Sequence, residues 1–102
     1  MNAVENQVRE LVEVELAAAN ERFPQLHSAH EGWAVIREEV CELAVDAEAV
    51  AGHINDAWNL IMLNENPSCS IKQVQVRAIH AACEAIQVAA MCRKFVEMGA
   101  GQ

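Results

Sequence analysis

The sequence is poor in aromatic residues and in residues that make turns. Aromatic side chains account for only 4% of the 102 residues, and there are two prolines, four glycines and no tyrosine. A fold of many short strands is excluded, because it would need turn residues every ten or so positions. Apolar residues still make up 53% of the chain. The composition therefore predicts one all-α domain, a bundle of long helices with a core of alanine, valine, leucine and isoleucine.

Basic residues are also scarce, with 7 Lys and Arg against 15 Asp and Glu, which gives a net charge of −8. A nucleic-acid backbone would be repelled over most of such a surface, so nucleic-acid binding is not expected. A small phosphorylated molecule is a different case, because divalent cations can sit between carboxylates and phosphates. The charge therefore leaves metal-dependent phosphate chemistry open.

The four cysteines show no Cys-x-x-Cys spacing, no basic and apolar leader precedes the first helical pattern, and no apolar run reaches membrane-spanning length. These absences predict a cytoplasmic protein without a membrane segment. Cys83 and Cys92 fall within an apolar stretch, and free cysteine is often buried. Both are expected to be small core residues.

Apolar residues recur every three or four positions, which predicts three helices. The first should stop near Pro24, and Ser28 with Glu31 resembles a capping box that starts the second. Small polar residues around Pro67 predict the turn before the third helix, and Gly52 could kink the second. Within one domain of residues 1–102, the predicted helices span about 3–22, 29–63 and 71–98.

Three helices with long apolar stripes cannot close a large core in so short a chain. We therefore expect a homo-oligomer, either a dimer or a tetramer. Trp33 is expected to lie in the core, as tryptophan commonly does. The buried centre of the second helix is predicted to follow Ile36, Val40, Leu43 and Ala47.

Acidic residues gather on one flank of the second helix when it is drawn at about 100° per residue. Glu39, Glu42 and Asp46 lie on this flank, with His53 further along it. Such a group can be an ordinary solvated face, or it can converge on one cation. Two other acidic residues fall round the back of the helix, where solvent is expected: Glu38 and Asp56.

The third helix supplies an isolated polar group. Between Ala78 and Cys92 the sequence is apolar on nearly every side, so this stretch is predicted to be buried all round. Its strongly polar residues are His80, Glu84 and Gln87, which share one face with Met91. A buried, ionised Glu84 needs either a metal or a hydrogen-bonding partner such as His80 or Arg77.

Glu38-Glu39-Val40-Cys41-Glu42-Leu43 followed by Glu84-Ala85-Ile86-Gln87-Val88-Ala89-Ala90-Met91 resembles the MazG-like all-α nucleoside triphosphate pyrophosphohydrolases. Their pattern is Glu-x-x-Glu on one helix and Glu-x-x-Asp on the next, together holding Mg²⁺. The stretch from Ser28 to Val35 also resembles small, often phage-borne members. About the last two thirds of the chain take part. Gln87 stands where the family has an aspartate, and the spacing between the two motifs is longer.

The resemblance implies an enzyme that uses Mg²⁺, or Mn²⁺ in its place, to hydrolyse a nucleoside triphosphate to the monophosphate and pyrophosphate in nucleotide house-cleaning or phage nucleotide metabolism. Glu39, Glu42 and Glu84 would hold the metal, with Gln87 and Asp46 as auxiliary ligands. Either Glu38 or Asp46 would accept the proton from water. The residues expected to contact phosphate are Lys72, Arg77, Arg93 and Lys94, and those expected to contact the base are Trp33, Met91 and His30.

Gln87 also supports an alternative. A glutamine can offer a neutral oxygen to a metal, but it cannot act as a carboxylate base. The alternative hypothesis is therefore a non-catalytic helical oligomer with the same fold that binds nucleotides or regulates another protein.

Overall fold

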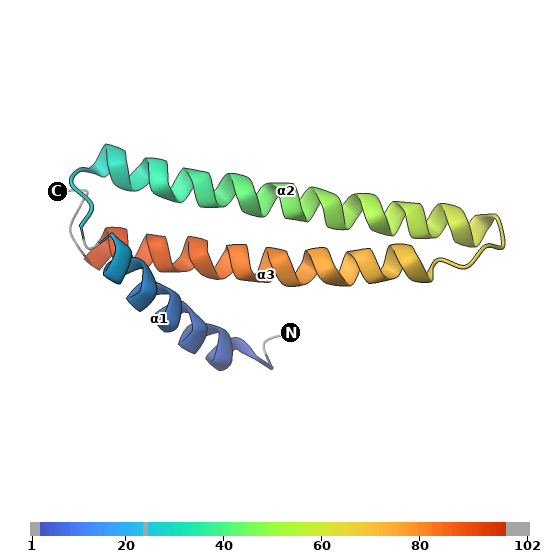
Figure 1. Cartoon of the computed structure of the whole chain (residues 1–102), viewed down its shortest axis with the longest axis horizontal. Helices are drawn as coiled ribbons and strands as arrows, with labels where there is room; N and C mark the ends of the chain where they lie inside the picture. The colour runs from blue at the N-terminus through green and yellow to red at the C-terminus, as the bar shows by residue number, and fades with distance from the viewer. Residues whose placement is uncertain (1–2, 24, 98–102) are drawn as a thin grey trace.

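Three α-helices make up the computed structural model, which describes residues 3–23 and 25–97 (Figure 1). They are α1 (Glu5–Arg22), α2 (Ala29–Met62) and α3 (Ser68–Glu97). No strand occurs within the described ranges, so the prediction of an all-α fold is confirmed. The two long helices α2 and α3 form an antiparallel hairpin, and α1 packs against the C-terminal part of α3 (Figure 1).

Local sequence signals set the helix ends. α1 ends at Arg22, as predicted from Pro24, because a proline disfavours helical geometry in the residue before it, which is Phe23. Ser28 caps α2 by accepting a hydrogen bond from the Glu31 amide at 3.1 Å. The Glu31 carboxylate accepts from the His27 amide instead of returning to Ser28, so half of the predicted capping box forms.

Two boundaries differ from those predicted by more than one residue. α3 begins at Ser68 instead of residue 71, because the Asn66 side chain accepts hydrogen bonds from the amide of Ser68 at 2.9 Å and from its hydroxyl at 2.6 Å. Pro67 fits at such a start, since a helix leaves its first amides unpaired in any case. α1 begins at Glu5 instead of residue 3, and the predicted end at residue 98 lies outside the described residues. α2 runs through Gly52 as one helix.

The packing of α2 on α3 follows a repeat of 3.5 residues. Buried and half-buried residues recur in steps of four and three along both helices, which is the pattern of a coiled-coil seam. Most members are apolar or small, but several are ionisable. The seam residues are Gly32, Ile36, Glu39, Leu43, Asp46, Val50, His53, Ala57 and Leu60 on α2, and Ser70, Val74, Arg77, Ala81, Glu84, Val88, Met91 and Phe95 on α3.

This seam corrects the predicted centre of α2. Val40 and Ala47 are exposed, while the neighbouring Glu39 and Asp46 take the inward positions. Ile36 and Leu43 of the predicted centre do lie in the seam. The prediction is wrong at Val40 and Ala47, because it followed the more apolar residues, which lie one position to the side of the contact. Trp33, at 63% exposed, is likewise outside the core for which it was predicted.

The prediction that residues 78–92 are buried on all sides is also wrong for the single chain. Ala90 is the one buried residue of that stretch, and Cys83 and Cys92 are exposed. A helix in a three-helix chain can be covered only where another helix passes, and α1 reaches only the C-terminal part of α3. Oligomerisation, which would cover more of it, stays a prediction.

Polar contacts fasten α1 to α3. Arg93 forms an ion pair with Glu13, and the buried Lys94 ammonium donates a hydrogen bond to the backbone oxygen of Phe23. The apolar part of this junction consists of Leu16 and Ala19, both buried, and Ala90. The lysine contact caps the C-terminus of α1, where backbone oxygens lack hydrogen-bond donors within the helix. Within the described residues, no helix combines the length and apolar character needed to cross a membrane.

We expect a Gly32→Ala variant to lose about 1–3 kcal/mol of unfolding free energy, the usual cost of overpacking. A Cβ atom there would lie 2.7 Å from Phe95 Cε2 and closer still to Cδ2, so the Phe95 ring must leave its place in the seam or the two helices must move apart. Chemical denaturation measures the change. The matched control is Gly52→Ala, whose Cβ would meet no atom within 4 Å and which should gain up to about 1 kcal/mol from helix propensity. Equal effects of the two substitutions would contradict the packing described here.

Candidate functional site

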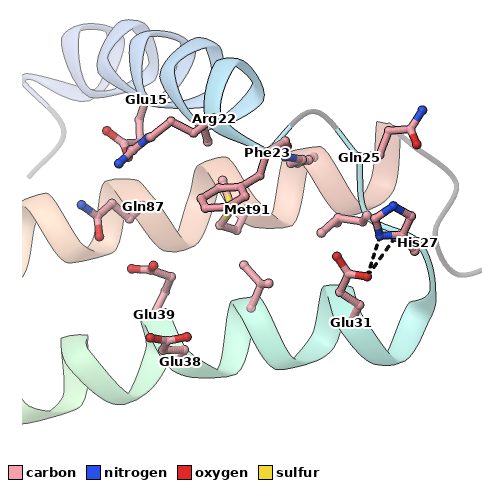
Figure 2. A pocket seen from close by; sticks show the side chains of 14 residues that line it. Glu15, Arg22, Phe23, Gln25, His27, Glu31, Glu38, Glu39, Gln87 and Met91 are labelled. Atoms are coloured by element: carbon pink, nitrogen blue, oxygen red, sulfur yellow. Dashed lines mark hydrogen bonds and ion pairs between the residues drawn. The ribbon is translucent and has the colours of Figure 1, made fainter.

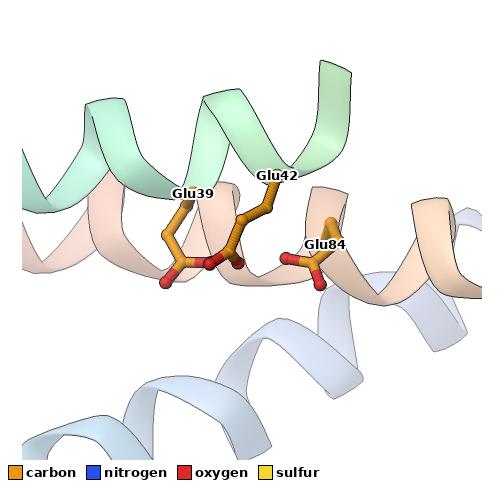
Figure 3. Close-up of side chains that lie close together, drawn as sticks. All are labelled: Glu39, Glu42 and Glu84. Carbon is orange, nitrogen blue, oxygen red and sulfur yellow. The ribbon is translucent and has the colours of Figure 1, made fainter. Parts of the chain in front are cut away.

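Three glutamates converge from the two long helices (Figure 3). Glu39 and Glu84 occupy half-buried seam positions, and Glu42 lies one turn after Glu39 on α2. One carboxylate oxygen from each lies within 4.8 Å of the others. Two oxygens on opposite sides of a Mg²⁺ ion are about 4 Å apart, so small side-chain rotations would bring all three onto one cation. We call this set the acidic cluster.

Burial and repulsion make Glu39 and Glu84 hold protons more tightly than isolated glutamates do. Desolvation, followed by the charges of Glu42, Glu84 and Glu38, raises the pKa of Glu39 from 4.5 to about 6. Desolvation also raises the pKa of Glu84, helped by a hydrogen bond and repulsion from Glu42 and by the charge of Asp46, while His80 opposes the shift. A cation placed among these groups would relieve the repulsion.

Gln87 bridges the acidic cluster. With its amide nitrogen turned toward the carboxylates, it donates hydrogen bonds to Glu39 Oε2 at 2.7 Å and to Glu84 Oε2 at 3.0 Å. The predicted auxiliary ligand is therefore placed with the cluster. Turning the amide by 180° would present its oxygen in the same place, and an amide oxygen is an acceptable ligand for Mg²⁺.

Asp46 lies beside the acidic cluster without joining it. It is buried, and its carboxylate forms an ion pair with Arg77 at 3.6 Å. Of the two partners predicted for Glu84, Arg77 pairs with Asp46 instead. The other, His80, lies near enough to lower the pKa of Glu84. Asp46 and Arg77 are seam residues, and their charges offset one another between the helices.

The remaining acidic and imidazole groups of α2 are separate from the acidic cluster. His53 lies two turns beyond Asp46, and its Nδ1 is 3.9 Å from Asp56. Asp56 and Glu38 are exposed, as predicted from the helical wheel. Glu38 nevertheless contributes to the raised pKa of Glu39, so it lies near the edge of the cluster.

A cavity of about 700 Å³ adjoins the acidic cluster (Figure 2). Its walls come from the C-terminal end of α1, the connection to α2, and the facing parts of α2 and α3. Glu39 and Gln87 are among its lining residues, so the cavity opens directly onto the cluster. The lining is apolar at Ala19, Phe23, Leu26, Val35 and Met91, and polar or charged at Glu15, Arg22, Gln25, His27, Glu31, Glu38 and Lys94.

Only one of the three residues predicted to contact a base lines this cavity. Met91 does so, and it is drawn together with Phe23 among the lining side chains in Figure 2. Trp33 and His30 instead line a separate hollow of about 300 Å³ together with Ala29. The predicted role of Trp33 and His30 beside the acidic cluster therefore has no geometric support.

The basic residues predicted to contact phosphate are spread widely. Lys94 lines the cavity, although its ammonium is bonded to Phe23. Arg93 points to Glu13 and Glu97, and Arg77 to Asp46. Lys72 lies 12 residues before Glu84 on α3, about 18 Å along the helix axis. The basic side chain that sequence reasoning missed is Arg22, which lines the cavity from the end of α1.

Two further lining residues that were not predicted lie in the segment just after α1. Phe23 and Leu26 flank the proline that ends α1, and the sequence marked this segment only as a break between helices. An apolar residue on each side of a helix break was the available signal, because such residues often pack where the chain changes direction.

Comparisons with family models, with curated proteins and with solved structures gave no match.

We expect metal-free protein to lose stability as the pH rises from about 4.5 through about 6. The folded state binds the Glu39 proton more tightly than the unfolded state does, so raising the pH across this window favours unfolding. Glu39→Gln should weaken this dependence, leaving the contribution of Glu84, and raise Tm by a few degrees at pH 7.5 in chelator, with little effect at pH 4. Thermal unfolding across pH at fixed protein concentration measures it. Glu48→Gln, an exposed change on the same helix, should follow the wild type; a Glu39→Gln profile that also does so would contradict the assigned repulsion.

Proposed function

We propose that the chain is a nucleoside triphosphate pyrophosphohydrolase of the MazG-like class that depends on Mg²⁺, with Mn²⁺ able to replace it. One observation carries the proposal: the three carboxylates of the acidic cluster converge beside a cavity large enough for a nucleoside. They come from the two motifs on which the resemblance to that class is based. The proposal rests on this agreement between motif and geometry.

The donor set suits a hard divalent cation. Glu39, Glu42 and Glu84 supply carboxylate oxygens, and Gln87 can add a neutral oxygen. When bound, the cation would neutralise phosphate charge and lower the pKa of a coordinated water. A protein of net charge −8 needs such a cation to bind a triphosphate, since the cavity otherwise meets the substrate with several carboxylates.

The reaction adds water across one phosphoanhydride bond. The water oxygen bonds to the α-phosphorus, the bond from that phosphorus to the α–β bridging oxygen breaks, and pyrophosphate leaves. We assign Glu38 as the group that accepts the proton of the water. Two observations favour it over Asp46: Glu38 lines the cavity, whereas Asp46 is buried in an ion pair with Arg77.

The cavity is proposed to hold the nucleoside. Its volume falls within the range of about 300–1,000 Å³ that is usual for small-molecule sites. Phe23, Leu26 and Met91 would contact the base through their apolar surfaces. Arg22, at the exposed end of α1, would contact phosphate oxygens that the cation leaves free.

A second function is favoured by the position of Gln87. Its two hydrogen bonds to Glu39 and Glu84 hold the acidic cluster together with a neutral group. A chain that keeps this arrangement would bind a nucleotide in the cavity without hydrolysing it, as a binding or regulatory module. The two functions differ in whether the bound nucleotide releases pyrophosphate.

We expect pyrophosphate release from at least one nucleoside triphosphate in Mg²⁺, and none in chelator. A panel of canonical, deoxy and modified nucleotides measures it. Glu84→Gln should reduce the rate to the chelator background, because it removes one carboxylate from the cation site. It should remain folded, since neutralising a repelled carboxylate does not weaken the helices. Glu48→Gln serves as the control. Nucleotide binding without release from any member of the panel would instead support the non-catalytic module.

We expect Gln87→Glu to lower Tm in chelator and to enlarge the rise in Tm that Mg²⁺ produces. The substitution replaces a donor with a carboxylate at 2.7 Å and 3.0 Å from two existing ones, which adds repulsion that a cation relieves. A ligand that binds the folded state raises its stability, and the rise is larger at a given ligand concentration when the affinity is higher. Gln73→Glu makes the same charge change at an exposed position of α3 and should leave the Mg²⁺ effect unchanged. Equal Mg²⁺ effects in both variants would show that the cation binds elsewhere.

A further inference from the structure

The α2–α3 hairpin has two broad faces, and the cavity lies on one of them. The residues that line it from α2, such as Val35 and Glu38, each stand one position before a seam residue, and so do Gln87 and Lys94 on α3. Successive residues are about 100° apart, so positions just after the seam residues lie on the opposite face. In an antiparallel pair the matching flanks of both helices meet on the same side. We call this opposite side the outer face.

The outer face of α2 is apolar along most of its length, with Arg37 as its one charged residue. The exposed residues that follow seam positions include two tryptophans, Trp33 at 63% exposed and Trp58 at 59%. Large apolar side chains lie toward both ends, and alanine lies at the centre. In chain order, the apolar residues that define this stripe are Trp33, Val40, Ala47, Ile54, Trp58 and Ile61.

The outer face of α3 repeats the arrangement. Ile71 and Val96, both exposed, stand at the two ends, and the residues between them on this face are mainly alanine. These alanines are Ala78, Ala82, Ala85 and Ala89. The Ala78 end of this row of alanines is level with Ala47 of α2, because the neighbouring Asp46 forms an ion pair with Arg77 at 3.6 Å.

Charge is distributed unevenly around the hairpin. None of the 15 acidic residues of the chain occupies a position of the outer face, and Arg37 is its one charged residue. Exposed apolar surface of this extent marks an interaction site in most soluble proteins.

The surface area gives the size of the partner contact. The chain exposes 7360 Å², whereas a compact monomer of 11.2 kDa would expose about 5,700 Å². The difference is about 1,700 Å² for each chain. Two copies that each buried this excess would share an interface of about 3,300 Å², within the range of about 2,000–5,000 Å² typical of obligate homodimers.

We propose that the outer face binds a second copy of the chain, and that the two hairpins form a four-helix bundle about a two-fold axis that passes near Ala47. With the axis across the helices, α2 runs antiparallel to α2 of the second copy. Trp33 then faces Ile61 of the second copy, and Val40 faces its Ile54, because each pair is equidistant from Ala47. The alanines at the centre let the helices approach closely, while the bulky ends fill the wider spaces.

The dimer is independent of the proposed catalysis, because the acidic cluster and the cavity open on the other face. Glu39→Gln and Glu84→Gln should leave the dimer intact. Conversely, failure to release pyrophosphate would leave the interface unaffected. The two proposals can therefore fail separately.

Light scattering coupled to gel filtration at tens of micromolar protein tests the interface. The wild type should have twice the 11.2 kDa mass of one chain. Ala47→Glu and Ala47→Lys should each halve that mass, because the axis places like charges against one another. An equimolar mixture of the two variants should restore the doubled mass, because the introduced carboxylate of one copy would then face the introduced ammonium of the other. Val45→Glu, an equal charge change on an exposed residue of the same helix but on the cavity side, should stay dimeric.

The Ala47→Glu and Ala47→Lys variants could each unfold as single chains. The mixing experiment still tests the interface in that case, because helix content measured by circular dichroism would return together with the doubled mass. A single-chain mass for the wild type overturns the proposal. So does a doubled mass that survives both substitutions at residue 47, or a Val45→Glu variant that dissociates as they do. A mixture that stays at the single-chain mass would overturn the antiparallel placement and with it the proposal.

Discussion

The structure depends on the seam between α2 and α3. Its 3.5-residue repeat fixes which residues of the two helices face each other, and it places Glu39, Asp46, Arg77 and Glu84 at positions where a hairpin built for stability alone would have apolar side chains. The acidic cluster follows from that placement. Glu39 and Glu84 meet because the seam brings them together, and they are partly desolvated because the same packing excludes water.

Two kinds of compensation operate along this seam. Asp46 is paired with Arg77, so its burial is offset within the protein. Glu39 and Glu84 have no such counter-charge in the acidic cluster and rely on shared protons and on the Gln87 amide. Negative charge in the seam is therefore neutralised at Asp46 and left without a counter-charge at Glu39 and Glu84. Buried carboxylates without a counter-charge favour the binding of a cation.

Helix number, the end of α1, the start of α2 and the grouping of the acidic residues could be predicted from the sequence, because they depend on local signals: the 3.5-residue spacing, the proline after Phe23 and the Ser28 cap. The inward face of α2 could be predicted only in part, at Ile36 and Leu43. The stripe through Val40 and Ala47 is more apolar than the seam beside it, and hydrophobicity alone selects the wrong one of the two. The cavity was equally hidden, since Arg22 and Phe23 acquire their neighbours only when α1 folds back on α3.

The attachment of α1 separates two properties that many binding sites combine. All three carboxylates belong to the hairpin, whereas much of the cavity wall belongs to α1 and the short connection that follows it. Arg93 and Lys94 fasten α1 to the C-terminal part of α3. Substitutions in the first quarter of the chain can therefore reshape the chamber while the ionic centre keeps its geometry. Over evolutionary time, or in the laboratory, selectivity for the organic part of a ligand can drift without any change in the chemistry applied to it.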